Sequence, residues 1–179
     1  MAPAHTLESE IMRATILAVC SALVFCAHYS IRAQDAFPAG PNHFSFIGNW
    51  DCKGQFINGK THHSHYTVQT VLGGAWLQLS ESDIEPHGYL SEYLVRFDPA
   101  QKLYIEEDIN NFGYARYTSP GWQQDRLVFT GIDAHYAQPL PENRFVYTVT
   151  GPNTFDVSWE SRRDSNSAFR SSDLIHCTR

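Results

Sequence analysis

Two strand-like segments, one near position 50 and one at the C-terminus, constrain the fold of this chain most. Residues 46–52 (FIGNWDC) and residues 174–179 (LIHCTR) each carry one of the only two cysteines that follow position 30. First and last strands lie side by side in a closed β-barrel, because closure removes exposed sheet edges. We therefore expect a β-barrel whose first and last strands are joined by a disulfide between Cys52 and Cys177.

The disulfide is the first of two readings of these cysteines. Disulfides persist in exported proteins, and closing so long a loop contributes about 4–5 kcal/mol in the chain-entropy model. The alternative reading is a pair of buried free thiols. A redox-active pair is disfavoured, because the chain contains no Cys-x-x-Cys spacing.

Residues 1–33 have the pattern of a secretory signal peptide. A positively charged residue precedes an apolar run over residues 14–27, and a more polar stretch with small residues follows. We expect cleavage after Ala33, with Ala27 as the second choice, and Met12 is an alternative start. The apolar run is shorter than the roughly 20 residues of a membrane-spanning helix.

Removal of this segment would leave one domain in the periplasm or outside the cell. Residues 34–43 contain two prolines and are expected to be a disordered lead-in. Residues 44–179 are long enough for a single domain with a sizeable core. Lipidation at Cys20 or Cys26 is disfavoured, because a bulky residue precedes each of these cysteines.

The charge of the chain disfavours two classes of partner. The formal net charge is -6 at pH 7, and no run of lysines and arginines occurs. An acidic surface repels nucleic-acid phosphates and anionic lipid headgroups. We expect no nucleic-acid partner and no membrane insertion after the signal peptide is removed.

From residue 44 onward, short strand-like runs alternate with turn residues. A period of two is clear in residues 145–150 and 155–160, which are joined by Gly-Pro-Asn, a tight-turn sequence. The other runs are residues 46–52, 66–72, 75–79, 89–97, 103–109, 114–118, 127–130 and 169–176. These short runs in meander order predict an all-β fold, an antiparallel up-and-down β-barrel of about eight to ten strands. Barrels of this size enclose either packed side chains or one small ligand.

An ordered series of short motifs is similar to known barrels. Gly48-x-Trp50 resembles the Gly-x-Trp motif of lipocalins and the wider calycin group, in which the tryptophan plugs the closed end and a late arginine packs across it. The whole series resembles a family of uncharacterised secreted bacterial proteins with a lipocalin-like fold, which implies a hydrophobic cavity and no established reaction. Its motifs are Phe46-Ile47-Gly48-x-Trp50-x-Cys52-x-Gly54, Leu72-Gly73-Gly74-x-Trp76-Leu77, Asp108-x-Asn110-x-x-Gly113, Thr118-Ser119-Pro120-Gly121-Trp122, Trp159-Glu160 and Cys177-x-Arg179.

The chain also resembles the nitrobindins, barrels that bind haem through a histidine near the C-terminus. His176 is the histidine in a comparable place. Side chains two apart on a strand share a face, so an inward Trp50 implies an inward Cys52. A bonded Cys177 would then face inward and His176 outward. We therefore expect no haem and no other cofactor.

A cluster of three histidines, His62-His63-x-His65, suggests a metal site. On a strand, His63 and His65 share a face about 7 Å apart, a spacing that suits two imidazoles on one zinc or copper ion. Candidates for a third ligand, by residue type alone, are His43, His87 and His135. We favour the simpler reading, a solvated strand start or loop, and expect no metal.

Carboxylates gather at Glu106-Glu107-Asp108, with Glu81, Asp83, Glu85 and Glu92 nearby in the sequence. Two carboxylates that face one cavity could perform acid–base chemistry, because burial and mutual repulsion separate their pKa values. Alternation places Glu107 with three apolar residues of its strand, so we expect Glu107 to face inward. The alternative is a solvated outer face. No nucleophile elbow, phosphate loop, dinucleotide fingerprint or His-Glu-x-x-His motif occurs, and no catalytic residue is assigned.

Aromatic residues make up 13% of the chain and are the candidate lining of a cavity. The candidate ligand-binding set is Trp50, Trp76, Tyr93, Tyr104, Glu107, Tyr147 and Trp159.

The sequence thus predicts an exported barrel that binds a small apolar or amphipathic molecule in its lumen. One alternative is an isomerase or hydrolase that uses Glu107, which an apolar cavity with a carboxylate of raised pKa would favour. The other is a ligand-free structural or interaction barrel, which a filled interior and an exposed apolar patch would favour.

Overall fold

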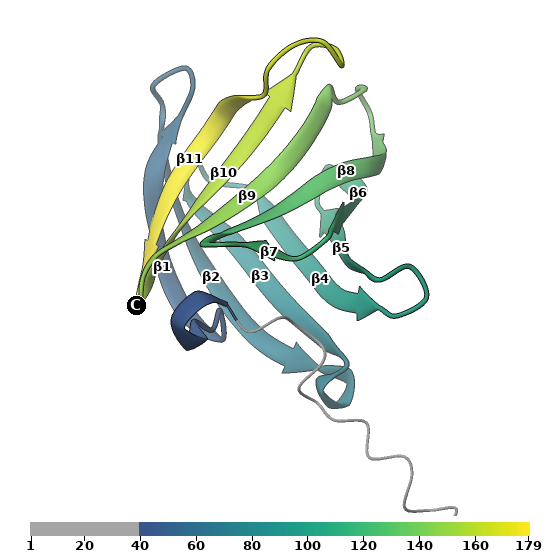
Figure 1. The fold of residues 1–179 in the computed structure, drawn as a ribbon. Coiled ribbons are helices and arrows are strands. Elements are labelled where there is room, and N and C mark those ends of the chain that lie inside the picture. Colours follow the sequence, from purple (N-terminus) through teal and green to yellow (C-terminus); the bar gives the residue numbers. More distant parts are fainter. Residues whose placement is uncertain (1–39) are drawn as a thin grey trace, which may run out of the picture. The chain divides into compact units, whose positions relative to one another are not determined.

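Ten antiparallel strands close into a barrel in the computed structural model, which describes residues 40–179 (Figure 1). They are β1 (Gly48–Phe56), β2 (Thr61–Val71), β3 (Trp76–Glu85), β4 (Leu90–Asp98), β5 (Leu103–Asn110), β6 (Gly113–Ser119), β8 (Arg126–Tyr136), β9 (Glu142–Gly151), β10 (Thr154–Arg162) and β11 (Arg170–Thr178). A short strand outside the barrel, β7 (Trp122–Gln123), pairs only with β8. Two 3-10 turns, η2 (Pro41–His43) and η3 (Leu72–Gly74), complete the elements.

The predicted all-β, antiparallel up-and-down barrel is confirmed, and each predicted run overlaps a strand. Several details differ. The strand β7 was not predicted, and β3 and β8 continue beyond the predicted runs to Glu85 and Tyr136. β2 begins at Thr61 rather than at residue 66, so the histidine cluster lies within a strand. The start of β2 was not predicted because even its inward side chains, His62 and Ser64, are polar and give no alternation of apolar and polar residues.

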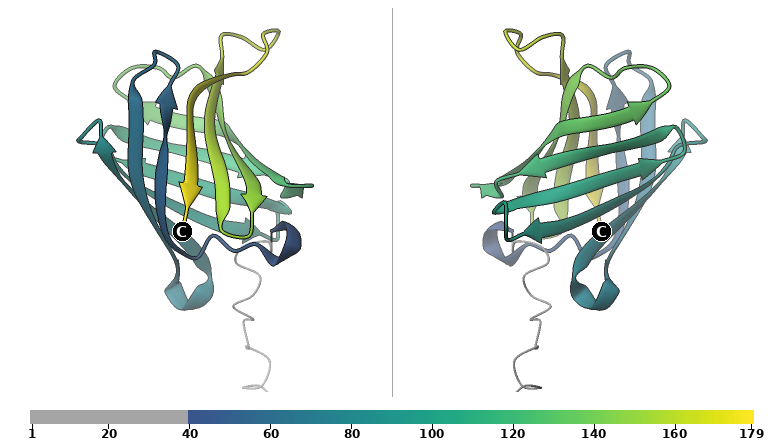
Figure 2. Two further views of the ribbon diagram at one scale, coloured as in Figure 1. Left: turned by 90° about the vertical axis from the view of Figure 1, so that its left-hand side faces the viewer. Right: turned by 90° about the vertical axis from the view of Figure 1, so that its right-hand side faces the viewer.

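Most strands pair with the next strand along the chain. Two pairings join strands that are not consecutive, β1 with β11 and β6 with β8, and are called seams below. Figure 2 shows β1 and β11 side by side. Each seam contains a glycine at a close backbone approach. A Cβ atom at Gly54 would overlap the carbonyl oxygen of Leu174, and one at Gly113 would overlap that of His135. Only glycine therefore fits at these two positions of the barrel wall.

The predicted Cys52–Cys177 disulfide is confirmed, and the alternative of two free thiols is wrong. The two cysteines are directly opposite each other on β1 and β11 and are fully buried. The bond therefore joins the first and last strands at one seam of the barrel.

Trp50 closes one end of the barrel, as the resemblance to lipocalins implies. Its side chain is 1% exposed, and Nε1 donates a hydrogen bond to the carbonyl oxygen of Phe46 over 2.7 Å. The guanidinium of Arg179 lies 4.3 Å from the centre of the Trp50 ring. Phe44 packs against Phe46 with 4.9 Å between ring centres, so the segment before β1 covers this closed end.

The barrel interior changes from apolar at the closed end to polar at the other, open end. Along β3, the inward side chains are Leu77, Leu79, Glu81 and Asp83 in that order. Strands β2, β5 and β11 show the same order, with inward His62, Asp108 and Asp173 near the open end. Most polar interior groups therefore gather at one end of the barrel, whereas Glu106 is buried deeper, beside Phe46 and Val95.

The expected signal peptide, residues 1–33, lies outside the described residues, as do residues 34–39 of the expected lead-in. The remaining lead-in residues include η2, and the strands account for most of residues 44–179. Within residues 40–179, no helix has the length and apolar character needed to cross a membrane.

Reduction of the Cys52–Cys177 disulfide is expected to lower the free energy of unfolding by about 2–4 kcal/mol, because the bond restricts the unfolded chain across most of the domain. Urea unfolding with and without reductant measures the difference. The Cys52→Ala, Cys177→Ala double variant is the control, and its midpoint should not respond to reductant. Equal midpoints for the oxidised and reduced protein would contradict this role of the disulfide.

Candidate ligand-binding cavity

A cavity of about 430 Å³ lies at the open end of the barrel. Strand ends and the turns opposite Trp50 form its lining. Its walls are largely aromatic, with contributions from Phe56, Tyr66, Tyr89, Tyr93, Phe112, Tyr117, Tyr136, Phe145 and Trp159. The ring of Phe112 is 65% exposed and stacks on Tyr89, so this pair forms part of the rim.

His62 is the centre of the polar part of the cavity. Its Nδ1 bonds Asp173 over 2.8 Å, its Nε2 bonds Asp83 over 3.1 Å, and Glu81 lies 3.9 Å away. Phe56 stacks on the imidazole with 4.6 Å between ring centres. Burial by itself lowers the pKa of His62, but the hydrogen bonds to Asp173 and Asp83 outweigh it and raise the pKa to about 10. At neutral pH, an imidazolium ion is therefore held between two carboxylates.

Glu81 is the most buried carboxylate of this group. Tyr93 donates a hydrogen bond to Glu81 Oε2 over 2.7 Å, and Tyr93 is itself 3.3 Å from the hydroxyl of Tyr89. Burial raises the pKa of Glu81 to about 7, because it outweighs the hydrogen bond from Tyr93. Near neutral pH, Glu81 can therefore either hold or release a proton. His62, Glu81, Asp83 and Asp173 are called the His62 cluster below.

A second polar group of the cavity surrounds Asp108. Ser91 donates a hydrogen bond to Asp108 over 2.7 Å, Asn110 donates over 3.0 Å, and Tyr136 donates over 3.2 Å. Burial raises the pKa of Asp108 despite these hydrogen bonds. All the hydrogen bonds to this carboxylate come from neutral donors, so no cation of the described chain is hydrogen-bonded to it.

Asp173, which lines the cavity, has one carboxylate oxygen without a hydrogen-bond partner among the described residues. Its Oδ2 atom bonds His62, whereas its Oδ1 atom is buried and has no hydrogen-bond partner among the described residues. A buried acceptor without a donor is costly, and a bound molecule that donates a hydrogen bond would relieve that cost. The His62 cluster also has more carboxylates than cations, so the polar end of the cavity is acidic.

Of the candidate ligand-binding residues, Tyr93 and Trp159 line the cavity. Trp50 lies at the closed end, where it serves as the plug described above. Tyr147 is buried deeper in the barrel and donates a hydrogen bond to Glu106 Oε2 over 3.3 Å. The structure therefore brings only part of the predicted set together.

Two aromatic candidates lie away from the cavity. Trp76 is on the outer face of β3, where the guanidinium of Arg96 lies 5.0 Å from its ring centre. Tyr104, at the start of β5, packs against Phe97 near the closed end, with 5.1 Å between ring centres. Aromatic character alone did not distinguish the inner from the outer face, because partly exposed aromatic residues are common in barrels and in proteins generally.

The expectation that Glu107 faces inward is wrong. Glu107 lies on the outer face and pairs with Arg116, whose Nη2 is 2.6 Å from Glu107 Oε1, whereas Glu106 is 1% exposed. The apolar residues on the Glu107 face were taken as core, but Ile109 is 50% exposed. The inner face of β5 instead carries Asp108, which lines the cavity at the open end, and Glu106, which is buried deeper in the barrel.

The His62 cluster was not predicted as a site, although a signal for it exists in the sequence. Glu81 and Asp83 continue the alternation of Leu77 and Leu79, so an inward apolar face becomes an inward acidic face along one strand. Charged residues are almost never buried unless they are paired or functional.

No protein-family model matches the chain, and no curated protein matches it. The barrel, the Trp50 plug and the terminal Arg179 are consistent with a lipocalin-like fold. Membership of the uncharacterised secreted family remains a prediction from the motifs.

Glu106→Gln is expected to raise the thermal unfolding midpoint at pH 8 by at least about 2 °C and to leave it unchanged at pH 4. Burial, and then repulsion from Asp108, raise the pKa of Glu106 well above its ordinary value of 4.5. A raised acid pKa gives stability that is present below pH 4.5 and is lost as pH rises toward the folded value. The neutral glutamine does not suffer this loss.

Glu107→Gln is the matched control for Glu106→Gln, because it makes the same chemical change on the outer face of the same strand. It removes an exposed ion pair and should not raise the midpoint at either pH. A Glu106→Gln curve parallel to that of the wild type from pH 4 to 8 would show that Glu106 is ionised in the folded barrel.

Proposed function

We propose that this protein is an exported binding protein for one small amphipathic molecule with a cationic or hydrogen-bond-donating head group. The observation that carries the proposal is the aromatic cavity of about 430 Å³ with the acidic His62 cluster inside it. Ligand sites typically have volumes of about 300–1,000 Å³, mostly apolar walls and a few polar groups that fix orientation. The cavity meets each of these criteria.

The aromatic walls support an apolar body for the ligand. Side chains such as Tyr66, Phe145 and Trp159 surround the cavity, and Val157 and Ile175 add aliphatic surface. Removing an apolar chain from water into such a site contributes about 25 cal/mol for each Å² buried. The walls therefore supply affinity, and the polar groups supply orientation.

The His62 cluster supports the choice of head group. His62 carries one positive charge between two carboxylates, and Asp173 Oδ1 lacks a donor among the described residues. The excess of carboxylates in the cluster attracts an ammonium group, and a rotation of Asp173 that turns Oδ1 toward the cavity would let an ammonium or hydroxyl group donate to it, whereas a carboxylate, sulfate or phosphate would be repelled. The cavity should therefore prefer amines, then alcohols, over acids of the same chain length.

Export is supported by two independent features. Residues 1–33 have the composition of a signal peptide, and Cys52 is bonded to Cys177. Disulfides are typical of the periplasm and the extracellular space. We therefore place the ligand outside the cytoplasm.

The head-group preference can be tested with octylamine, octanol and octanoate, which share one apolar chain. Calorimetric titration at pH 7 should give the tightest binding for the amine and the weakest for the acid. Asp173→Asn should reduce the amine-over-acid preference by about tenfold or more, since a charge-assisted hydrogen bond contributes about 1.5–3 kcal/mol.

Asp156→Asn is the matched control, because Asp156 bonds His176 on the outer face in the same way that Asp173 bonds His62 inside. Its preference should equal that of the wild type. Equal affinities for amine and acid in the wild type would refute the proposed role of the His62 cluster. No binding of any of the three would refute the carrier function for molecules of this size.

The environment of Glu81 supports a second candidate function, which is proton transfer within a bound molecule. It lines an apolar cavity, its pKa is raised to about 7, and Tyr93 is hydrogen-bonded to it. These are the properties of a general base at neutral pH. An isomerase of this kind would exchange a ligand hydrogen with solvent.

This alternative predicts deuterium uptake from D₂O into a carbon position of any molecule that co-purifies with the protein and is identified by native mass spectrometry. The uptake should be lost in Glu81→Gln and retained in Glu107→Gln. If a bound molecule takes up no deuterium, the protein acts as a carrier and not as an isomerase.

A further inference from the structure

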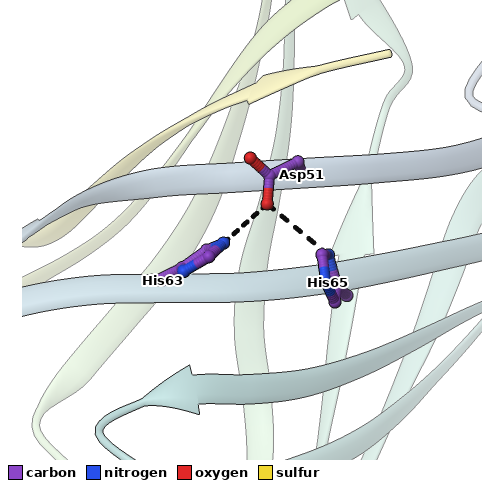
Figure 3. Close-up of side chains that lie close together, drawn as sticks. All are labelled: Asp51, His63 and His65. Carbon is purple, nitrogen blue, oxygen red and sulfur yellow. Dashed lines mark hydrogen bonds and ion pairs between the residues drawn. The ribbon is translucent and has the colours of Figure 1, made fainter.

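Two histidines and one aspartate meet on the outer wall of the barrel (Figure 3). Asp51 lies on β1, and His63 and His65 lie on β2. Inward Trp50 and Cys52 place Asp51 outward, because successive side chains of a strand face opposite sides. Inward His62 likewise places His63 and His65 outward.

The pairing of β1 with β2 brings the three side chains together. Asp51 lies directly opposite His65 in the strand register, and His63 is two residues away on the same face. Asp51 Oδ1 is 2.6 Å from His63 Nε2 and 3.6 Å from His65 Nδ1. The two imidazole rings have centres 5.6 Å apart. One carboxylate oxygen thus faces both histidines.

This donor set fits a transition metal. Two imidazoles and a carboxylate are the protein ligands of many zinc sites with an open coordination position. Donor atoms bound at 2.0–2.1 Å to one tetrahedral ion lie about 3.3 Å apart. The separation of 3.6 Å between Asp51 and His65 is close to this value. The shorter separation to His63 would widen when a metal replaces the shared proton.

We propose that Asp51, His63 and His65 bind a divalent transition-metal ion of the zinc class on the outer wall of the barrel, with the remaining coordination position open to water. The third ligand is a carboxylate on the neighbouring strand. The histidines that residue type suggested for this role lie elsewhere: His43 in η2, His87 at the cavity and His135 beside Tyr114.

Lys53 is the charge that opposes metal binding here. Its ammonium contacts Asp51 Oδ2, which leaves Oδ1 for the metal. The lysine side chain is 64% exposed, so it can move away without leaving a buried gap. Because its positive charge repels a cation, Lys53→Gln should strengthen metal binding.

Other histidine–carboxylate groups of the described chain lack this arrangement. His176 with Asp156 and His135 with Asp133 are outer-face pairs of one histidine and one aspartate each. The buried group of His62, Glu81 and Asp83 has only one imidazole, and its second ring nitrogen is hydrogen-bonded to Asp173. Only the Asp51 group offers two histidines to one ion among residues 40–179.

The test is calorimetric titration of the full, untagged protein with Zn²⁺, followed by Co²⁺ titration with visible absorption spectroscopy. The wild type should bind one ion at this site and give the intense cobalt bands of a four-coordinate complex. His65→Gln and Asp51→Asn should each weaken this binding by at least about tenfold. His176→Gln is the matched control and should leave it unchanged, and Lys53→Gln should strengthen it.

Thermal unfolding of each variant without metal checks that the barrel is intact, which is expected because His65 and Asp51 are partly exposed. Unchanged Zn²⁺ affinity in both His65→Gln and Asp51→Asn would overturn the proposal. Loss of binding in His62→Gln together with unchanged affinity in Asp51→Asn would overturn it as well, because the ion would then lie in the cavity. Absence of Zn²⁺ binding by the wild type would also overturn it.

Discussion

The pairing of β1 with β11 is the interaction on which the rest of this structure depends. It closes the sheet, places Cys52 opposite Cys177 and brings Arg179 over Trp50. A slip of one residue would turn every side chain of a strand to the other face. The disulfide, the plug and the glycine at the seam therefore all fix the same register. The inner and outer positions of β1 and β11 follow from that register.

The open half of the barrel interior contains several ionisable groups whose burial lowers the stability of the fold. Burying ionisable groups is costly, and well-packed apolar residues would serve the core better. The protein offsets part of the cost by holding His62 between Asp83 and Asp173, and by hydrogen bonds from neutral donors to Glu81 and Asp108. Perturbed ionisable groups gathered in one cavity are a mark of functional sites. The closed half, by contrast, is packed mainly with aromatic rings, with Glu106 buried beside them.

The sequence was sufficient to predict the fold, but it predicted only part of the residues that line the cavity. Alternation and turn residues located every barrel strand, and the two late cysteines located the seam. It was harder to predict which face of each strand points inward, because alternation alone does not show which set of alternate side chains lies inside the barrel. Glu107 was assigned inward since its neighbours are apolar, yet this barrel has a polar inner half. The partners of His62 come from strands distant in the sequence, so only the folded register brings them together.

The wall of a β-barrel is a single layer of chain, and this has a consequence at His62 and His63. These neighbours face opposite sides of β2, one toward the cavity and the other toward Asp51. The inner and outer groups are thus separated by one peptide unit, with little water between them to screen charge. A charge gained on either side changes the electrostatic potential on the other. By thermodynamic linkage, whatever binds outside and whatever binds inside would each alter the affinity of the other by the same factor.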